Sequence, residues 1–265
     1  MIETSMEIAG SSSRSYKGNR RVDFAPWTSL PPLSTTKPVV EQSNTAGPDP
    51  LERTVALLIL ILATPVLLLI AFAIKLESPL GPVFYRQERV GLDRRKGDGN
   101  GHGIGDGTFS GHERRKIFGR GRSFLIWKFR TMIPDAESKT GPVWAQETDP
   151  RVTRVGNILR KARMDEVPQL INVVAGQMRL IGPRPERPVF VERLSEAFPE
   201  YPQRLQVPPG ITGLAQVQRS YDTDLNDVRK KLMYDLFYVE NRSPTLNMKI
   251  LMKTVGVVLN GRGAR

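Results

Sequence analysis

The chain has 265 residues, of which 39% are apolar, and its 39 Lys and Arg against 27 Asp and Glu give a net charge of +12. It has no Cys, which excludes a disulfide framework and thiolate metal or redox sites. Both His lie in a Gly-rich stretch, which argues against a histidine triad or a His-based zinc site. A pI near 10.2 points to an anionic partner: nucleic acid, a phosphorylated substrate or a membrane surface.

The N-terminal part of the chain divides into a polar and an apolar segment. Residues 1–50 are rich in Ser and Pro without an apolar period, so we predict that they are disordered. Residues 54–74 form an uncharged apolar run of 21 residues, which as a helix spans roughly 30 Å, about one hydrocarbon core. A transmembrane helix and a re-entrant helix that bends at Thr64-Pro65 both fit. A buried helix of a soluble protein is the third arrangement.

Two features count against a simple span. Pro65 lies near the middle of the run and removes a backbone hydrogen bond, and basic residues flank the run on both sides instead of one. A bend at Pro65 would return the chain to the face from which it came, with arms of roughly 15 Å each. These residues alone leave the spanning and re-entrant arrangements open.

The rest of the chain mixes short strands with helices, without a βαβ rhythm, and predicts the α+β class. Apolar alternation and turn residues predict strands at 79–92 (a strand or short hairpin), 123–132, 178–181 and 214–218. Helical spacing and end signals predict helices at 152–163, 166–174, 188–197, 227–239 and 245–259.

Two basic segments are open to more than one interpretation. Residues 93–121 hold nine Gly and two basic clusters, which favours a flexible solvated insertion over a nucleic-acid arm or an anionic-lipid contact. The helix at 152–163 is amphipathic and basic, which fits a helix on an anionic membrane as well as a plain surface helix.

The acidic pair Asp165-Glu166 is the most suggestive candidate for chemistry. Its plain interpretation is a helix start, with Asp165 as the N-cap and Glu166 in the first turn of a helix that ends at Gly176. Arg and Lys surround the pair in the sequence, and an ionised, positioned carboxylate is a competent nucleophile toward phosphorus. Glu166 would then hold Mg²⁺ or act as a base.

Basic residues near turns are candidates for phosphate binding. Arg184 lies between Pro183 and Pro185, where a fixed backbone suits a bidentate phosphate clamp. Lys128 and Arg130, at the end of a predicted strand, allow the same interpretation. Each of the three also fits an ordinary surface position.

Seven segments in order strongly resemble the bacterial sugar transferases, the monotopic phosphoglycosyl transferases. They are LATP, GPVFYRQERVG, KFRTM, DPRVTRVGNILRKARMDEVPQL, NVVAGQMRLIGPRPE, PGITGLAQV and YVENRSPTLNMKILMKT. The resemblance runs from about Leu51 to Arg265, interrupted by 93–121. It implies a membrane-anchored transferase domain at 51–265.

The resemblance implies transfer of a sugar-1-phosphate from a nucleotide diphosphate sugar, usually a UDP-sugar, to undecaprenyl phosphate, with release of UMP. This reaction starts capsule, exopolysaccharide or glycan assembly. Matched residue by residue, Asp165 resembles the covalent nucleophile and Glu166 its partner, a metal ligand or base, with Mg²⁺ as the cofactor. Arg160 matches a family arginine that handles phosphate, Lys128 matches the lysine of the KFR motif, and Arg184 matches the arginine of the PRP motif.

The resemblance also implies the re-entrant form of 54–74, with Thr64-Pro65 at the hinge and both ends on the cytoplasmic face of the bacterial inner membrane. No further transmembrane helix precedes the domain, which predicts the compact form of the family. The expected partners are the two substrates, the membrane and downstream glycosyltransferases. We expect no nucleic-acid partner, because the chain shows no aromatic platform or binding motif for one.

The chain departs from the family pattern at two places. Asn247 stands where many relatives have an aspartate in the final helix, and an amide brings no charge to a metal. Arg219 lies in an altered version of a family motif and is a candidate phosphate ligand. The alternative function is therefore a catalytically impaired, membrane-anchored adaptor. Which sugar is transferred we expect to depend on loops at 133–150 and 214–228.

Overall fold

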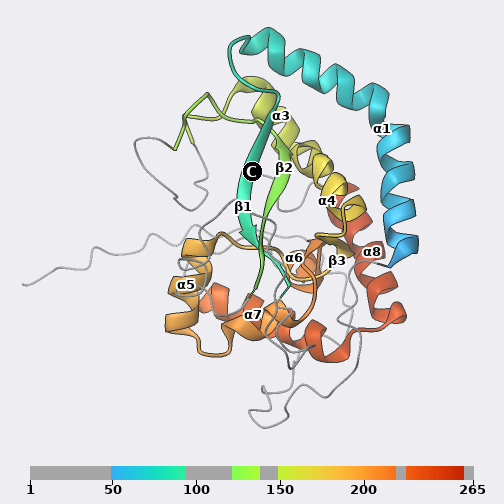
Figure 1. The fold of residues 1–265 in the computed structure, drawn as a ribbon, viewed down its shortest axis with the longest axis vertical. Helices are drawn as coiled ribbons and strands as arrows, with labels where there is room; N and C mark the ends of the chain where they lie inside the picture. Colours follow the sequence, from blue (N-terminus) through green and yellow to red (C-terminus); the bar gives the residue numbers. More distant parts are fainter. Residues whose placement is uncertain (1–48, 93–120, 138–148, 219–224, 260–265) are drawn as a thin grey trace, which may run out of the picture. The chain divides into compact units, whose positions relative to one another are not determined.

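The computed structural model describes residues 49–92, 121–137, 149–218 and 225–259, which all belong to one unit that spans Lys37–Arg265. Helices are mixed with two separate two-stranded sheets, as Figure 1 shows, so the prediction of a mixed helix and strand fold is confirmed. The predicted disorder of 1–50 and the predicted insertion at 93–121 lie almost wholly outside the described residues. The long helix begins at Pro50, the last residue of the first of these segments.

The described helices and strands follow the sequence predictions closely at most positions. The helices are α1 (Pro50–Glu77), α3 (Arg154–Lys161), η1 (Met164–Gln169, a 3₁₀ helix), α4 (Leu170–Val174), α5 (Pro188–Ala197), η2 (Tyr201–Gln206, also 3₁₀), α6 (Leu214–Gln218), α7 (Leu225–Asn241) and α8 (Pro244–Leu259). The strands are β1 (Phe84–Val90) and β2 (Ser123–Phe129), which pair antiparallel, and β3 (Arg179–Ile181) and β4 (Gly210–Thr212), which pair parallel.

The apolar run at 54–74 lies within the single helix α1, which contains Pro65. Proline has no N–H for the helix ladder, and the hydroxyl of Thr64 donates to the carbonyl of Leu60 at 2.8 Å. Both features are known causes of helix bending. Figure 1 shows that the axis of α1 bends partway along, so the predicted hinge lies inside one bent helix.

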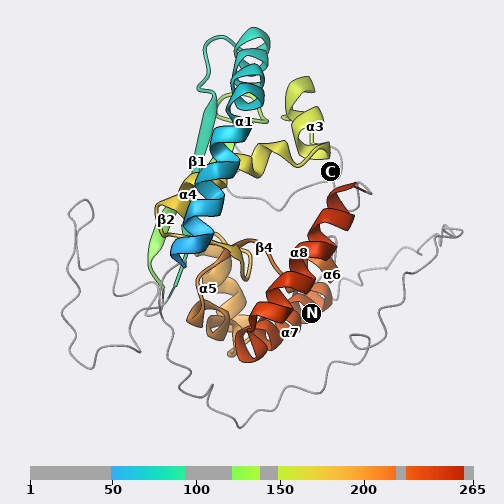
Figure 2. The same ribbon diagram turned by 90° about the vertical axis from the view of Figure 1, so that its right-hand side faces the viewer.

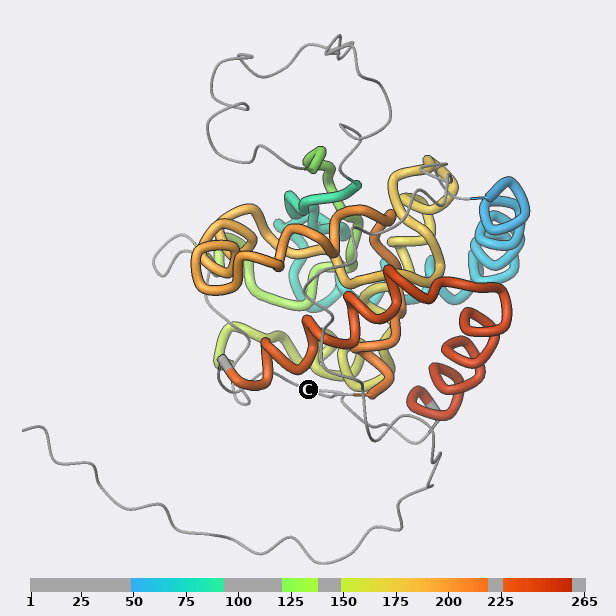
Figure 3. The backbone as a smooth tube through the Cα atoms, turned by 90° about the horizontal axis from the view of Figure 1, so that it is seen from below, coloured from blue at the N-terminus to red at the C-terminus, as the bar shows by residue number. Residues whose placement is uncertain are grey.

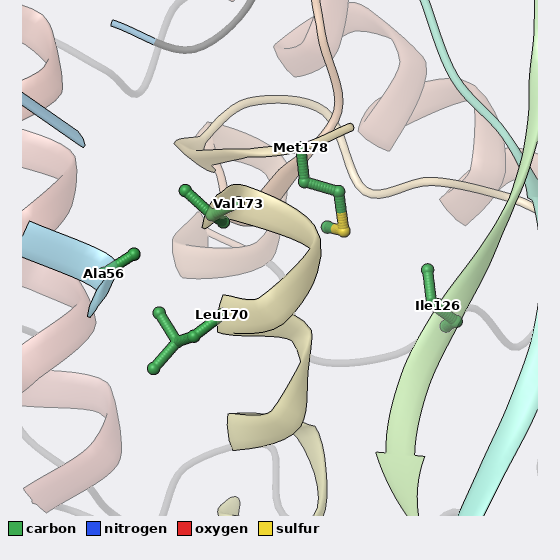
Figure 4. Packing of buried hydrophobic residues seen from close by; sticks show 5 residues of the cluster. All are labelled: Ala56, Ile126, Leu170, Val173 and Met178. Carbon is green, nitrogen blue, oxygen red and sulfur yellow. The ribbon is translucent and has the colours of Figure 1, made fainter. Parts of the chain in front are cut away.

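The core joins α1 to the rest of the unit through small and branched apolar residues. Ala56 is fully buried and packs in one cluster with Leu170 and Val173 of α4, together with Met178 and Ile126. Figure 4 shows α4 between α1 and β2, with the labelled side chains filling the space on both sides, and Figure 2 shows α1 and α4 side by side. A second cluster holds the other arm of α1, where Ile74 packs near Phe129 and Leu159.

Polar contacts tie both ends of α1 to the same unit. Near its start, Glu52 forms an ion pair with Arg179 of β3. At its end, the carboxylate of Glu77 accepts from the backbone N–H groups of Arg154 and Val155, at 2.7 and 3.0 Å, and so caps the first turn of α3. Each arm of α1 is therefore held by a separate part of the fold.

The helix start predicted at Asp165 is wrong in one respect. Asp165 and Glu166 lie inside the 3₁₀ helix η1, and the residue in the N-cap position is Arg163, which has φ 59°. Left-handed Arg163 redirects the chain after α3, and Pro168 removes one α-helical hydrogen bond, which favours the tighter turn. The α-helix begins only at Leu170, and the prediction that the helix stops near Gly176, with φ 80°, is confirmed.

The strand predicted at 214–218 is also wrong, because these residues form α6. The strand of this region is β4, which starts at Gly210. A Cβ at Gly210 would lie 2.0 Å from the backbone nitrogen of Gly182, so the parallel pair depends on this close approach. β4 pairs with β3 across an intervening α5, so the chain contains one parallel crossover that the α+β prediction had not included.

The last two helices match the predicted ranges and meet at a corner. Figure 3 shows α7 running across the view and α8 turning away from it. The inner face of α8 is anchored by Leu246 and Ile250, both buried, while its side chains at 248, 251, 252, 255 and 258 are exposed and apolar. These exposed side chains form an apolar stripe along the outer face of α8.

A matched pair of glycine substitutions tests the β3–β4 approach. Gly210→Ala is expected to lower the free energy of unfolding by about 1–3 kcal/mol or more, since its Cβ meets backbone that cannot move aside. Gly256→Ala in α8 is the control, because nothing lies within 4 Å of its Cβ. It should raise stability by about 0.5–1 kcal/mol. Chemical unfolding in detergent micelles measures both, and equal effects would contradict the packing described here.

Candidate active site

The site is organised around the carboxylate of Glu166 on η1. Its Oε1 lies 2.8 Å from Nζ of Lys128 on β2. The guanidinium of Arg184, in the loop after β3, forms a bidentate pair with the same carboxylate through NH1 and NH2. Three elements that are distant in the sequence therefore meet at one side chain.

The charges of these residues depend on one another. Burial acts to raise the pKa of Glu166, but the positive charges of Arg184 and Lys128 outweigh it and hold that pKa well below its usual range. Burial lowers the pKa of Lys128, against the attraction of Glu166. At neutral pH the cluster thus contains an ionised Glu166 whose two oxygens already contact cations.

Asp165 differs from its neighbour in having no hydrogen bond to its carboxylate among the described residues. Burial raises its pKa and the adjacent Glu166 carboxylate raises it further, while Lys128, Arg184 and Arg160 act in the opposite direction. The two carboxylates therefore have opposite pKa shifts. Asp165 is the one whose oxygens are free to meet an incoming group.

The loop at 182–187 that carries Arg184 is held by hydrogen bonds to successive backbone carbonyls. The carbonyl oxygens of residues 183, 184, 185 and 186 accept, in turn, from Gly210 N, Arg204 NH2, Arg89 NH1 and Val90 N, at 2.9 to 3.0 Å. Two prolines restrict φ in the same segment. The backbone beneath Arg184 is therefore fixed from both sheets and from η2.

Arg204 is the buried centre of that support. Its NH2 also donates to Asp235 of α7 at 2.6 Å, and its NH1 donates to the hydroxyl of Tyr201 at 2.6 Å. All three side chains are buried. Sequence reasoning missed them, although one signal existed: Asp235 shares the apolar face of α7 with Leu232, and an acid on such a face needs a buried cation.

The other predicted site residues are placed as follows. Arg160 donates through Nε to the hydroxyl of Thr131 at 3.0 Å and lies within electrostatic reach of Asp165. Arg130 is not part of the cluster: its NH1 and NH2 donate to the side chain and carbonyl of Ser78, at 2.9 and 3.0 Å, and it holds the end of α1.

Two further predicted residues lie away from the charged cluster or outside the described residues. Asn247 Oδ1 accepts from the hydroxyl of Tyr238 at 3.0 Å, a contact between α8 and α7. Arg219 lies outside the described residues, and its predicted phosphate contact stays a prediction.

No three His, Asp or Glu side chains gather in a metal-binding group within the part of the chain that the structure describes. The available donors at the site are the adjacent carboxylates of Asp165 and Glu166. Mg²⁺ commonly uses only one or two carboxylates and completes its shell with water and substrate phosphates. The pair therefore fits a magnesium ion that arrives with a phosphorylated substrate, and does not fit a closed, all-protein metal cage.

A family model described as bacterial sugar transferase matches residues 48–97 and 108–261 of the chain. The UDP-N-acetylgalactosamine-undecaprenyl-phosphate N-acetylgalactosaminephosphotransferase of Aeromonas hydrophila is 42% identical over 77% of this chain and 41% of its own length. The UDP-glucose:undecaprenyl-phosphate glucose-1-phosphate transferase of Caulobacter vibrioides is 37% identical over 90% of this chain and 79% of its own length. A protein of the same description from Escherichia coli K12 is 38% identical, and the chain covers 37% of its length.

Substitution of Glu166 tests the charge balance of the cluster. Glu166→Gln is expected to lower the free energy of unfolding at pH 7 by on the order of 2 kcal/mol, because it leaves Lys128 and Arg184 without their counter-ion. This value lies between the costs of losing an exposed and a fully buried ion pair. A lowered pKa stabilises the fold above the unfolded pKa, near 4.5, and this contribution is lost as the pH falls through the lower folded value. The deficit of the variant, measured by urea unfolding, should therefore shrink below pH 4.5.

Asp165→Asn is the control for that measurement, since it removes the neighbouring carboxylate. A raised pKa means that ionised Asp165 costs the folded state free energy above its folded pKa. The variant should match or exceed the wild type in stability at pH 7, and any gain should vanish below pH 3.8. Destabilisation equal to that of Glu166→Gln would refute the opposite shifts.

Proposed function

The chain belongs to the bacterial sugar transferase family, and on that premise we propose that it transfers a sugar-1-phosphate from a UDP-sugar to undecaprenyl phosphate and releases UMP. The observation that carries the proposal is the pairing of a free carboxylate, Asp165, with a carboxylate already held by two cations, Glu166. Relatives named for UDP-N-acetylgalactosamine and UDP-glucose support this class of donor and acceptor.

Asp165 is the nucleophile in this proposal. One carboxylate oxygen attacks the sugar-bearing phosphorus, a P–O bond to Asp165 forms, and the bond to the UMP oxygen breaks, so that UMP leaves with the electron pair. A phosphate oxygen of undecaprenyl phosphate then attacks the same phosphorus and displaces the Asp165 carboxylate. Neither displacement requires a proton to move, so Glu166 can stay paired with Lys128 and Arg184 throughout.

The surrounding cations serve the charge that develops on the transferred phosphoryl group. Lys128 and Arg184 stand beside Glu166, and Arg160 lies within electrostatic reach of Asp165. Because both oxygens of Glu166 contact cations, we assign it first the role of orienting them. Asp165 and Glu166 would also hold Mg²⁺, which when bound neutralises charge on the diphosphate.

The re-entrant membrane helix is part of the same proposal. In the most apolar 18-residue stretch of α1, 6% is buried inside the protein, so the surface of this helix is suited to lipid. Both ends of the helix are tied to one folded unit, Glu52 to Arg179 and Glu77 to the start of α3, and Pro65 and Thr64 lie between them. A straight span would carry those ends to opposite faces of a bilayer. We therefore place the enzyme on the cytoplasmic face of the bacterial inner membrane.

The exposed apolar stripe of α8 suits the same surface, and lipid is where the second substrate resides. The product, a polyprenyl diphosphate sugar, is the acceptor that glycosyltransferases of an exopolysaccharide or glycan pathway would extend. The alternative of an inactive adaptor rested on Asn247, whose contact with Tyr238 gives it a packing role.

Turnover is the first test. Purified protein with undecaprenyl phosphate, Mg²⁺ and a panel of UDP-sugars should release UMP in a lipid-dependent manner, and a radiolabelled sugar phosphate should remain on the protein when the lipid is omitted. Asp165→Asn should lower the rate by at least about 10³-fold, as expected for loss of a nucleophile, and should abolish the labelled adduct. Vesicle flotation checks that the variant still binds membrane, and substantial turnover by it would refute the assignment.

Membrane topology is the second test. Single Cys residues introduced at Ser78 and within residues 1–48 of this Cys-free chain should both react only when a membrane-impermeant maleimide has access to the cytoplasmic side. Arg242→Cys, in the folded unit, reports that side. If the N-terminal position is labelled only from the non-cytoplasmic side, the re-entrant arrangement is wrong and α1 is a transmembrane helix.

A further inference from the structure

The face of the β1–β2 pair that carries Lys128 also carries an aromatic side chain. Tyr85 is the direct cross-strand partner of Lys128. Directly opposite residues lie on one face of an antiparallel pair, with Cβ atoms about 4.5–5.5 Å apart. Tyr85 is thus the first side chain beyond Lys128, which in turn contacts Glu166.

Tyr85 lies at the open end of the site. The residue is 40% exposed, whereas the Lys128 side chain is 16% exposed. Three aromatic residues of this strand pair, Phe84, Trp127 and Phe129, lie on the opposite face, where Phe84 contacts the other two. Phe124 shares the face of Tyr85 but lies four residues along β2 from Lys128, opposite Arg89. The ring of Tyr85 therefore stands apart from that aromatic group, next to the charged cluster.

A second ion pair lies within electrostatic reach of the same tyrosine. Arg187, the last residue of the loop that carries Arg184, donates through NH1 and NH2 to the two carboxylate oxygens of Glu137, at 3.0 and 2.9 Å. Burial raises the pKa of Tyr85 and the charge of Glu137 raises it further, while Arg187 acts in the opposite direction. The three side chains therefore lie within electrostatic reach of one another.

Arg89 connects this pair with the reacting groups. Arg89 lies on the same strand face as Tyr85. The charges of Glu166, Arg184 and Arg187 all interact with its guanidinium. Near Asp165 the site thus consists of cations that suit a phosphate. Farther out it consists of the partly exposed ring of Tyr85, with the carboxylate of Glu137 and the guanidinium of Arg187 within electrostatic reach.

We propose that Tyr85 and the Glu137–Arg187 pair form the subsite for the sugar ring of the donor. This inference rests on the function proposed above. The sugar is bonded to the phosphorus that Asp165 attacks, whereas the uracil is separated from it by the α-phosphate and the ribose. The group that reaches the first side chains beyond the reacting centre is therefore the sugar.

The chemistry of the subsite matches a pyranose. One face of such a ring presents C–H groups, which pack on an aromatic surface, and its edge presents hydroxyls that both donate and accept. Glu137 accepts hydrogen bonds, Arg187 donates them, and the Tyr85 hydroxyl does both. Glu137 lies in the 133–150 loop that the sequence had suggested for donor choice.

The test compares UDP-sugar with UMP in the same variants. Tyr85→Ala is expected to raise the KM for the UDP-sugar that the wild type uses by about tenfold, while the inhibition constant of UMP stays within about twofold. Tyr85→Phe keeps the ring and should stay within about threefold of the wild type in KM. Glu137→Gln should change the ratio of kcat/KM between two UDP-sugars that differ in one hydroxyl.

Leu125→Ala is the matched control, since Leu125 is exposed on the opposite face of the same strand pair. It should leave KM and the UMP inhibition constant unchanged. If Tyr85→Ala lowers the melting temperature of the protein, Tyr85→Leu replaces it in the comparison, because Leu keeps apolar bulk without the flat ring.

The outcomes separate the two proposals. A UMP inhibition constant that rises in parallel with KM would place Tyr85 against uridine and overturn the sugar subsite, and so would an unchanged KM in Tyr85→Ala and Tyr85→Leu. In both cases turnover by the wild type would leave the proposed function intact. Lack of turnover by the wild type on every donor would overturn the function and the subsite together.

Discussion

The ion-paired carboxylate of Glu166 is the interaction on which the site depends. It holds Lys128 from β2 and Arg184 from the loop after β3 on one buried group, and so joins three segments of the chain. Burying one charge without the others would be costly, because each loses its hydration. This mutual requirement gives the cluster a single arrangement. The neighbouring Asp165 has no hydrogen bond to its carboxylate among the described residues, and its proposed role as nucleophile rests on this difference from Glu166.

The support beneath Arg184 shows how a short loop becomes rigid. Prolines restrict its backbone, but four successive carbonyls are also bound by groups from β1, β4 and η2. Arg204 contributes one of these bonds and is held in turn by Asp235 of α7. A change in α7, distant from Asp165 in the sequence, therefore acts on the loop that carries Arg184 through one buried ion pair. Such a pair adds positional definition more than net stability.

The same unit also holds the apolar helix at both ends. Ala56 allows α1 to approach α4 closely, while Glu52 and Glu77 attach its two arms to β3 and α3. The surface between these attachments is apolar and exposed, and Pro65 lies within it. Under the proposed function, such a joint would keep the reacting groups at a fixed height above the hydrocarbon, next to the phosphate of the lipid acceptor.

The order of motifs and the hydrophobic periodicity were enough to identify the family, the apolar helix and most element positions, because these depend on local spacing. They also singled out Asp165 and Glu166 as candidates, which stays a prediction. The tertiary structure decided which charges meet: it brought Lys128 to Glu166 but placed Arg130 against Ser78, although the two lie only two residues apart at the end of β2. It also turned 214–218 into a helix, since the contact of Gly210 with Gly182 sets where β4 lies. Contacts between distant segments arise from packing and burial, which no local pattern records.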